Sequence, residues 1–113
     1  MGSDSQEKNP LNRARFDEIL RDEVASLPPD ALKIYEGYAI GVVEQPCDRG
    51  EQYGVESVFV VARAGSRLLL FDDAEDEFGI GVPGDDGVLR EWNLYGELVF
   101  AIRNLRADTP PGL

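Results

Sequence analysis

The stretch GVESVFVVARAGSRLLLFDDAEDEF, residues 54–78, predicts a β-hairpin that ends in a dense run of carboxylates. Its first part, Val55 to Val61, is rich in β-branched and aromatic residues, and its second, Leu68 to Phe71, is apolar throughout. Gly65 lies between the two runs and can adopt the positive φ that a tight connection needs. Because neither run alternates cleanly with polar residues, both are predicted to be central strands covered on both faces.

The acidic run follows the second of these strands directly. It contains five carboxylates within six residues: Asp72, Asp73, Glu75, Asp76 and Glu77. Like charges this close repel one another, so we expect the run to face water or to bind a cation. A calcium loop does not fit, because the alternating oxygen ligands and the required glycine do not coincide. A solvated turn, a docking surface for a basic partner, a divalent-ion site and a glycosidase pair of carboxylates stay open.

The segment before the hairpin predicts a helix, a strand and a loop. A polar tail, residues 1–8, precedes Asn9 and Pro10, which are typical of a helix start. The helix is expected from Leu11 to about Leu27, and Pro28 and Pro29 end it. Residues 30–33 add a helical turn, residues 34–43 resemble a strand broken by two glycines, and residues 46–52 resemble a surface loop. This loop contains Cys47, a weak candidate nucleophile with no histidine to activate it.

The segment after the acidic run predicts a second hairpin and a last helix. Residues 79–84 fit the spacing G-x-G-x-x-G, but no helix follows to receive a pyrophosphate, so no dinucleotide cofactor is expected. Instead, residues 78–82 are predicted to pair with residues 88–92 around a turn at Asp85, Asp86 and Gly87. Trp92 is expected to anchor the core. Asn93 would cap a helix from Leu94 to Arg106, and residues 107–113 would form a tail.

The order of these elements predicts an α+β fold, in which a mostly antiparallel β-sheet meander is flanked by an N-terminal and a C-terminal α-helix. The chain has 113 residues, enough for one core, so a single domain over residues 9–106 is expected.

Charge and composition narrow the class of function. Eleven basic and 22 acidic residues give a net charge of -11, which repels nucleic acids and anionic membranes and attracts basic proteins. With a single cysteine, no apolar run of membrane-spanning length and no signal-peptide pattern, a cytoplasmic protein is expected. The chain contains no histidine, and no nucleophile, base and oxyanion donor fall together, so we expect a non-enzymatic protein without cofactor or metal.

The hairpin of residues 58–78 and the run LREWNLYGELVFAIRNL, residues 89–105, resemble the small acidic immunity proteins that neutralise bacterial toxins of type VI secretion or contact-dependent systems. The resemblance covers about residues 35–105 and implies a stoichiometric inhibitor of one cognate toxin, acting as a monomer or homodimer. A toxin with a basic, nucleotide-handling cleft would match. The partner-binding residues would then be Asp72, Asp73, Glu75, Asp76, Glu77, Asp85, Asp86 and Trp92. The alternatives are a nucleic-acid-mimicking inhibitor of a DNA-binding protein and a small divalent-metal-dependent hydrolase.

Overall fold

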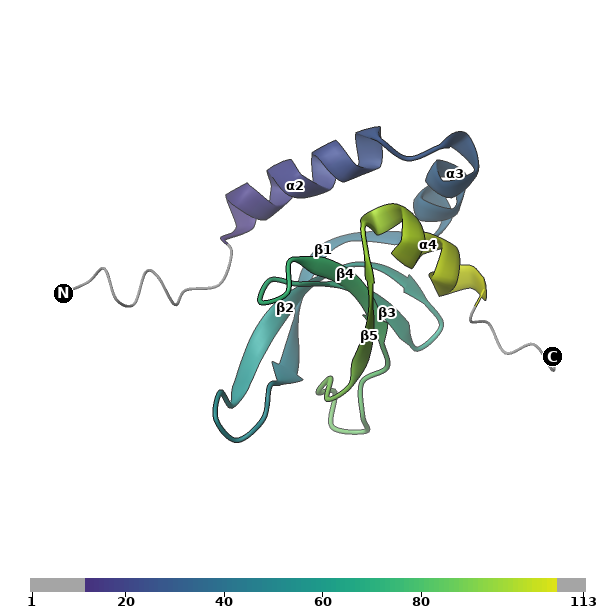
Figure 1. Ribbon diagram of the computed structural model, residues 1–113. Coiled ribbons are helices and arrows are strands. Elements are labelled where there is room, and N and C mark those ends of the chain that lie inside the picture. Colours follow the sequence, from purple (N-terminus) through teal and green to yellow (C-terminus); the bar gives the residue numbers. More distant parts are fainter. Residues whose placement is uncertain (1–11, 108–113) are drawn as a thin grey trace.

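The computed structural model describes residues 12–107, with the side chains of residues 12–105 placed. Five strands form one antiparallel sheet in the order β1-β2-β3-β4-β5, so each strand pairs with the next along the chain (Figure 1). Two helices precede the sheet and one follows it, which confirms the α+β prediction. The helices are α2 (Arg13–Ala25), α3 (Pro29–Tyr38) and α4 (Leu98–Ala107), and the strands are β1 (Ala39–Asp48), β2 (Val55–Ala64), β3 (Arg67–Asp72), β4 (Glu77–Gly81) and β5 (Trp92–Gly96).

The predicted central hairpin is confirmed as β2 and β3. Gly65 makes the turn between them with a φ of 64°. Val60 and Val61 are neighbours on β2 and so point to opposite faces, yet they are only 1% and 0% exposed. Leu69 and Leu70 on β3 are both 0% exposed. The sheet is therefore covered on both faces at this hairpin, as the continuous apolar runs predict.

One hydrophobic core lies between the sheet and the helices. Phe16 is the buried anchor of α2, and its ring stacks on that of Phe59 with centroids 4.8 Å apart. Phe71 and Phe78 complete this aromatic group from β3 and β4. Helix α4 buries its apolar stripe against the same face, through Leu98, Ala101, Ile102 and Leu105. This packing holds the helices on one side of the sheet (Figure 1).

A second, smaller core fills the opposite face of the sheet. Leu89, which is 0% exposed, packs there with Cys47 and with four apolar residues of β2 and β3. The backbone around Leu89 also binds the end of β1, since its N–H donates to the carbonyl oxygen of Pro46 at 3.0 Å and its carbonyl accepts from the N–H of Asp48 at 2.8 Å. The connection from β4 to β5 therefore folds back across the sheet and fixes the end of β1.

The first part of the chain differs from prediction at three places. Helix α2 begins at Arg13, where the Asn12 side chain accepts a hydrogen bond from the N–H of Arg15 at 2.8 Å. The predicted start at residues 9–11, the tail at residues 1–8 and all of the predicted tail 107–113 except Ala107 lie outside the described residues, and Ala107 is the last residue of α4. Residues 34–38, predicted as part of a strand, are helical. They continue α3, which begins at Pro29 and packs Ala31 into the core between the sheet and the helices. Strand β1 then runs on to Asp48 and β2 begins at Val55, so the loop predicted at residues 46–52 lies later in the chain, at residues 49–54.

The second hairpin also pairs in a different register from the predicted one. Strand β4 pairs with residues 92–96, not with residues 88–92, because Leu89 is drawn into the second core. Gly79 and Gly81 make this pairing possible: a Cβ at Gly79 would lie 2.5 Å from the carbonyl oxygen of Asn93. The G-x-G pair is thus a packing requirement of the sheet.

The last helix begins four residues later than expected. Gly96 has a φ of 86°, which is not helical, and residues 92–96 are extended in β5. The side chain of Glu23 in α2 accepts a hydrogen bond from the N–H of Leu98 at 3.0 Å. A carboxylate from another helix therefore caps the N-terminus of α4, and the predicted cap Asn93 does not. Among the described helices, none has the length and apolar character needed to cross a membrane.

Candidate protein-binding surface

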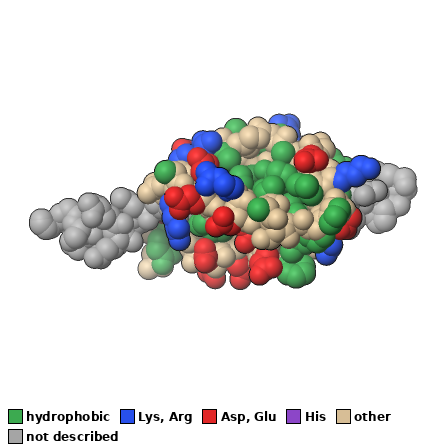
Figure 2. Space-filling view, turned by 90° about the horizontal axis from the view of Figure 1, so that it is seen from above, with side chains coloured by type: hydrophobic (Ala, Val, Ile, Leu, Met, Phe, Trp, Pro, Cys, Tyr) green, Lys and Arg blue, Asp and Glu red, His purple; other side chains and the backbone are tan. Residues whose placement is uncertain are grey.

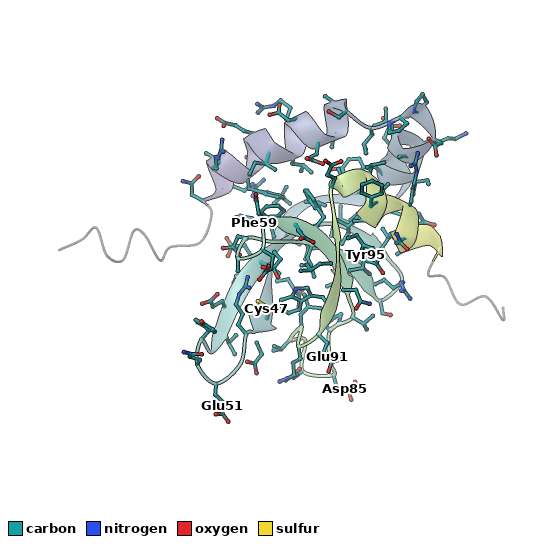
Figure 3. All side chains as sticks on the ribbon, in the orientation of Figure 1. Cys47, Glu51, Phe59, Asp85, Glu91 and Tyr95 are labelled. Atoms are coloured by element: carbon teal, nitrogen blue, oxygen red, sulfur yellow. The ribbon has the colours of Figure 1, made fainter. Side chains whose placement is uncertain are left out.

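Two connections project from the end of the sheet that faces away from the helices (Figure 1). Residues 49–54, here called the hairpin arm, join β1 to β2, and residues 82–91, the long arm, join β4 to β5. Figure 3 shows Glu51 at the tip of the hairpin arm and Asp85 and Glu91 on the long arm. A hollow of about 510 Å³ lies between the arms and is lined by Asp48, Arg49, Gly50, Arg90 and Trp92. We call Asp48 and the two arms together the acidic end.

The hairpin arm is a closed turn with its own hydrogen bonds. Gly50 and Gly54 adopt φ values of 102° and 74°, which few other residues tolerate. The N–H of Arg49 donates to the carbonyl of Gly54 at 2.9 Å, and the N–H of Gly54 donates to the carbonyl of Gly50 at 2.6 Å. Asp48 accepts from the N–H of Gly50 at 2.9 Å. Because of these hydrogen bonds, the hairpin arm has a defined backbone conformation.

Arg49 fixes the base of this arm to the rest of the sheet. Its Nη1 lies 3.2 Å from Asp72 Oδ1, its Nη2 lies 2.9 Å from Asp73 Oδ1, and its Nε lies 2.8 Å from Glu56 Oε1. The guanidinium also lies over the Trp92 ring, 5.9 Å from its centroid. Trp92 Nε1 donates to Asp72 Oδ2 at 2.9 Å. One cation thus connects carboxylates from β2, β3 and the β3–β4 turn, and the side chain of Arg49 is only 13% exposed.

Asp72 is the buried carboxylate of this network, with an exposure of 4%. Besides Arg49 and Trp92, it accepts hydrogen bonds from the backbone N–H groups of Ala74 and Glu75. Burial alone would raise the pKa of Asp72, but the hydrogen bonds from Trp92 and Arg49 outweigh it and hold the pKa below its usual value. Asp72 therefore does not face water, but its charge is matched by a cation, the Arg49 guanidinium, which is the other arrangement expected for the acidic run.

The long arm carries its own ion pairs. Arg90 binds Asp86 in a bidentate manner, with distances of 3.0 Å and 2.7 Å, and this pair lowers the pKa of Asp86 to about 2. Arg90 Nε also lies 3.9 Å from Asp48 Oδ2. Gln45 of β1 donates to the carbonyl of Gly87 at 2.6 Å, which links the arm to the edge of the sheet. Both cations of the acidic end, Arg49 and Arg90, are therefore already matched with carboxylates.

The eight predicted site residues do not form one surface. Asp72, Asp73 and Trp92 meet at Arg49, and Trp92, half-buried against the second core, serves there as the predicted anchor. Asp85 and Asp86 lie on the long arm of the same end. In contrast, Glu75 and Asp76 lie in the β3–β4 turn, where Asp76 lines a different hollow together with Arg15 of α2. Glu77 is the first residue of β4 and pairs with Asp72. The continuous acidic run of the sequence is thus divided between the Arg49 network, the β3–β4 turn and the start of β4.

Sequence reasoning missed five charged residues of the acidic end: Asp48, Arg49, Glu51, Arg90 and Glu91. Glu51, Asp85 and Glu91 are exposed and form no ion pair with any described residue. They come from segments some 30 residues apart, so only the composition of the two loops could have indicated them. On the helix side, some exposed carboxylates pair with arginines, as in Arg13–Asp17, Arg15–Glu18 and Arg103–Asp30, whereas Asp22 and Glu36 form no ion pair with a described residue. Figure 2 shows both signs of charge there.

Cys47 is not in a surface loop, contrary to expectation. It lies in β1 with an exposure of 0%, and burial raises the pKa of its thiol despite the nearby Arg49. The thiol therefore packs as an apolar side chain in the second core.

Within residues 12–107, no three histidine, cysteine, aspartate or glutamate side chains are arranged so that they could hold a metal ion. A search for similar proteins gave no match among protein-family models, curated proteins or solved structures.

Proposed function

We propose that this protein is a non-enzymatic inhibitor that binds a basic partner protein through its acidic end. The observation that carries the proposal is the set of three exposed carboxylates, Glu51, Asp85 and Glu91, which project on two arms without an ion-pairing partner among the described residues. Because Arg49 and Arg90 already form ion pairs, the remaining carboxylates of the acidic end are not neutralised within the protein. A positively charged surface on a partner protein would complement them.

The way the arms are held supports binding rather than simple solubility. Arg49 ties the hairpin arm to β2 and β3, and Arg90 ties Asp86 to Asp48 across the long arm. Carboxylates on a preorganised frame lose less conformational entropy on binding than carboxylates on a free loop. The immunity proteins that the sequence resembles would use such a surface to cover the basic cleft of a toxin, and this is the type of partner we propose.

Affinity capture from the cells in which the protein is made tests the proposal with two charge-matched variants. The first, Glu51→Gln/Asp85→Asn/Glu91→Gln, removes three negative charges from the acidic end. The control, Glu75→Gln/Asp76→Asn/Glu77→Gln, removes three from the β3–β4 turn and the first residue of β4, so both variants change the net charge from -11 to -8. We expect the wild-type protein and the control to retain one basic protein at a 1:1 ratio and the first variant to lose it.

The retained protein should also lose its own activity when the wild-type protein is added stoichiometrically. Retention of that protein by both variants, or its loss from the control alone, would place the binding surface elsewhere. A nucleic-acid mimic gives a third pattern, in which many DNA-binding proteins are retained and all are released by moderate salt.

A further inference from the structure

The two most exposed large apolar side chains in the described part of the chain lie on the hairpin arm and on the first residue of β2, directly after it. Tyr53 and Val55 are each 64% exposed, whereas the next, Phe100 on α4, is 51% exposed. Single exposed apolar residues are common on protein surfaces, but Tyr53 on the hairpin arm and Val55 at the start of β2 are only two positions apart. Their position beside Glu51, one of the exposed carboxylates, places apolar and acidic groups on the same tip.

The backbone presents Tyr53 in a fixed turn. Its N–H donates to the carbonyl of Gly50 at 3.1 Å, and the same carbonyl accepts from the N–H of Gly54. Arg49, directly before the turn, is held by three carboxylates and lies over Trp92. A tyrosine has only two side-chain torsions to restrict, so on a turn of this kind it binds at a low entropy cost.

We propose that Tyr53 is the anchor of the interface and that the hairpin arm enters a concave apolar site on the partner whose rim carries lysine and arginine. This inference rests on the proposed function, and it adds the shape and chemistry of the partner site. A flat basic surface would leave Tyr53 and Val55 in water, whereas a rimmed pocket buries them and pairs Glu51 with the rim. Buried tyrosines surrounded by polar contacts are typical of the residues that dominate binding energy.

The proposal divides the work between two kinds of side chain. The exposed carboxylates steer the encounter, so they control the association rate and its dependence on salt. Tyr53 acts after contact, so it controls the dissociation rate. These two effects can be measured separately.

The test uses the basic protein retained by the wild-type chain in the capture experiment, and surface plasmon resonance at several salt concentrations. Tyr53→Ala is expected to raise Kd at least about tenfold through faster dissociation, with an unchanged salt slope, as anchor truncations do. Tyr53→Phe should retain most of the affinity, and Phe100→Ala on the helix side is the matched control and should bind as wild type. Because Tyr53 is so exposed, the melting temperature of each variant should match that of wild type.

A photo-crosslinking amino acid in place of Tyr53 then locates the partner site. Cross-links to a concave site bordered by lysine and arginine support the proposal. Cross-links to a flat or acidic surface, or an unchanged Kd for Tyr53→Ala, overturn it while leaving the proposed function intact if the acidic-end variant still loses binding. If the wild-type chain retains no basic protein at all, both proposals fail.

Discussion

The acidic turn between β3 and β4 and the acidic end of the sheet differ in how their charges are used. Residues 72–77, at and around this turn, hold five carboxylates, but Asp72 is buried and Asp73 binds Arg49, so only part of this charge is free, at Glu75 and Asp76, which are exposed and form no ion pair with a described residue. The acidic end has fewer carboxylates in any one segment, yet Glu51, Asp85 and Glu91 face water on two arms. Density of charge along the chain therefore does not decide where free charge lies in space.

The comparison also separates two roles for a carboxylate. A buried carboxylate stabilises the fold only while its cation and hydrogen-bond donors stay in place, and removing one partner leaves the others uncompensated. An exposed carboxylate contributes little to stability and is free to meet a partner protein.

Asp72→Asn should lower the free energy of unfolding by about 3 kcal/mol, because Arg49 loses its most buried partner while remaining largely buried itself. Asp73→Asn is the matched control: it removes the same charge from the same guanidinium at a more exposed position and should cost less than about 1 kcal/mol. Urea denaturation measures both. Equal costs for the two variants would show that burial does not distinguish these carboxylates.

Acid should remove the contribution of Asp72. Its pKa is lower in the folded protein than in the unfolded chain, where it is about 3.9. The stabilisation is therefore fully present above about pH 4 and is lost as the pH falls through the folded-state pKa. We expect the stability difference between wild type and Asp72→Asn to be constant from pH 7 to pH 5 and to shrink at pH 3, as followed by urea denaturation at each pH. A difference that does not change with pH would mean that the charge on Asp72 is not what stabilises the network.

The acidic-end variant Glu51→Gln/Asp85→Asn/Glu91→Gln should change the free energy of unfolding by no more than about 0.5 kcal/mol, because these side chains are exposed and have no ion pair to lose. A small increase in stability is the expected direction, since three charges fewer reduce the self-repulsion of an acidic chain. Thermal denaturation of the variant and of the wild type measures this difference in stability. A loss comparable to that of Asp72→Asn would reveal a structural role for this surface.

The sequence predicts the centre of the fold better than its later connections. The hairpin of β2 and β3 follows from local apolar runs and Gly65, and α2 follows from its stripe and its proline stop. Residues 88–96 could not be assigned in the same way. Leu89 is buried in a second core built from β1, β2 and β3, and this long-range contact is not visible in the local sequence. The helical spacing of Leu94 and Leu98 was misleading, since Gly96 ends a strand between them.

In the candidate site, too, only features that depend on neighbouring residues could be predicted from the sequence. Asp85 and Asp86 could be placed on a turn from their neighbours in the sequence, and they do lie on the long arm. The burial of Asp72 could not be foreseen, because it depends on Arg49, 23 residues earlier, and on Trp92, 20 residues later. Glu51 and Glu91 gain their importance only when β1, β2, β4 and β5 bring the two arms to one end of the sheet.

The association rate constant of the captured partner protein tests most directly whether the acidic end is the docking surface. It should be measured by stopped-flow at low salt for the wild type and for the two variants that each remove three charges. We predict that Glu51→Gln/Asp85→Asn/Glu91→Gln slows association about tenfold and that Glu75→Gln/Asp76→Asn/Glu77→Gln slows it much less, because steering depends on charges near the contact. Equal slowing by both variants, or a larger effect at the β3–β4 turn, would contradict the account.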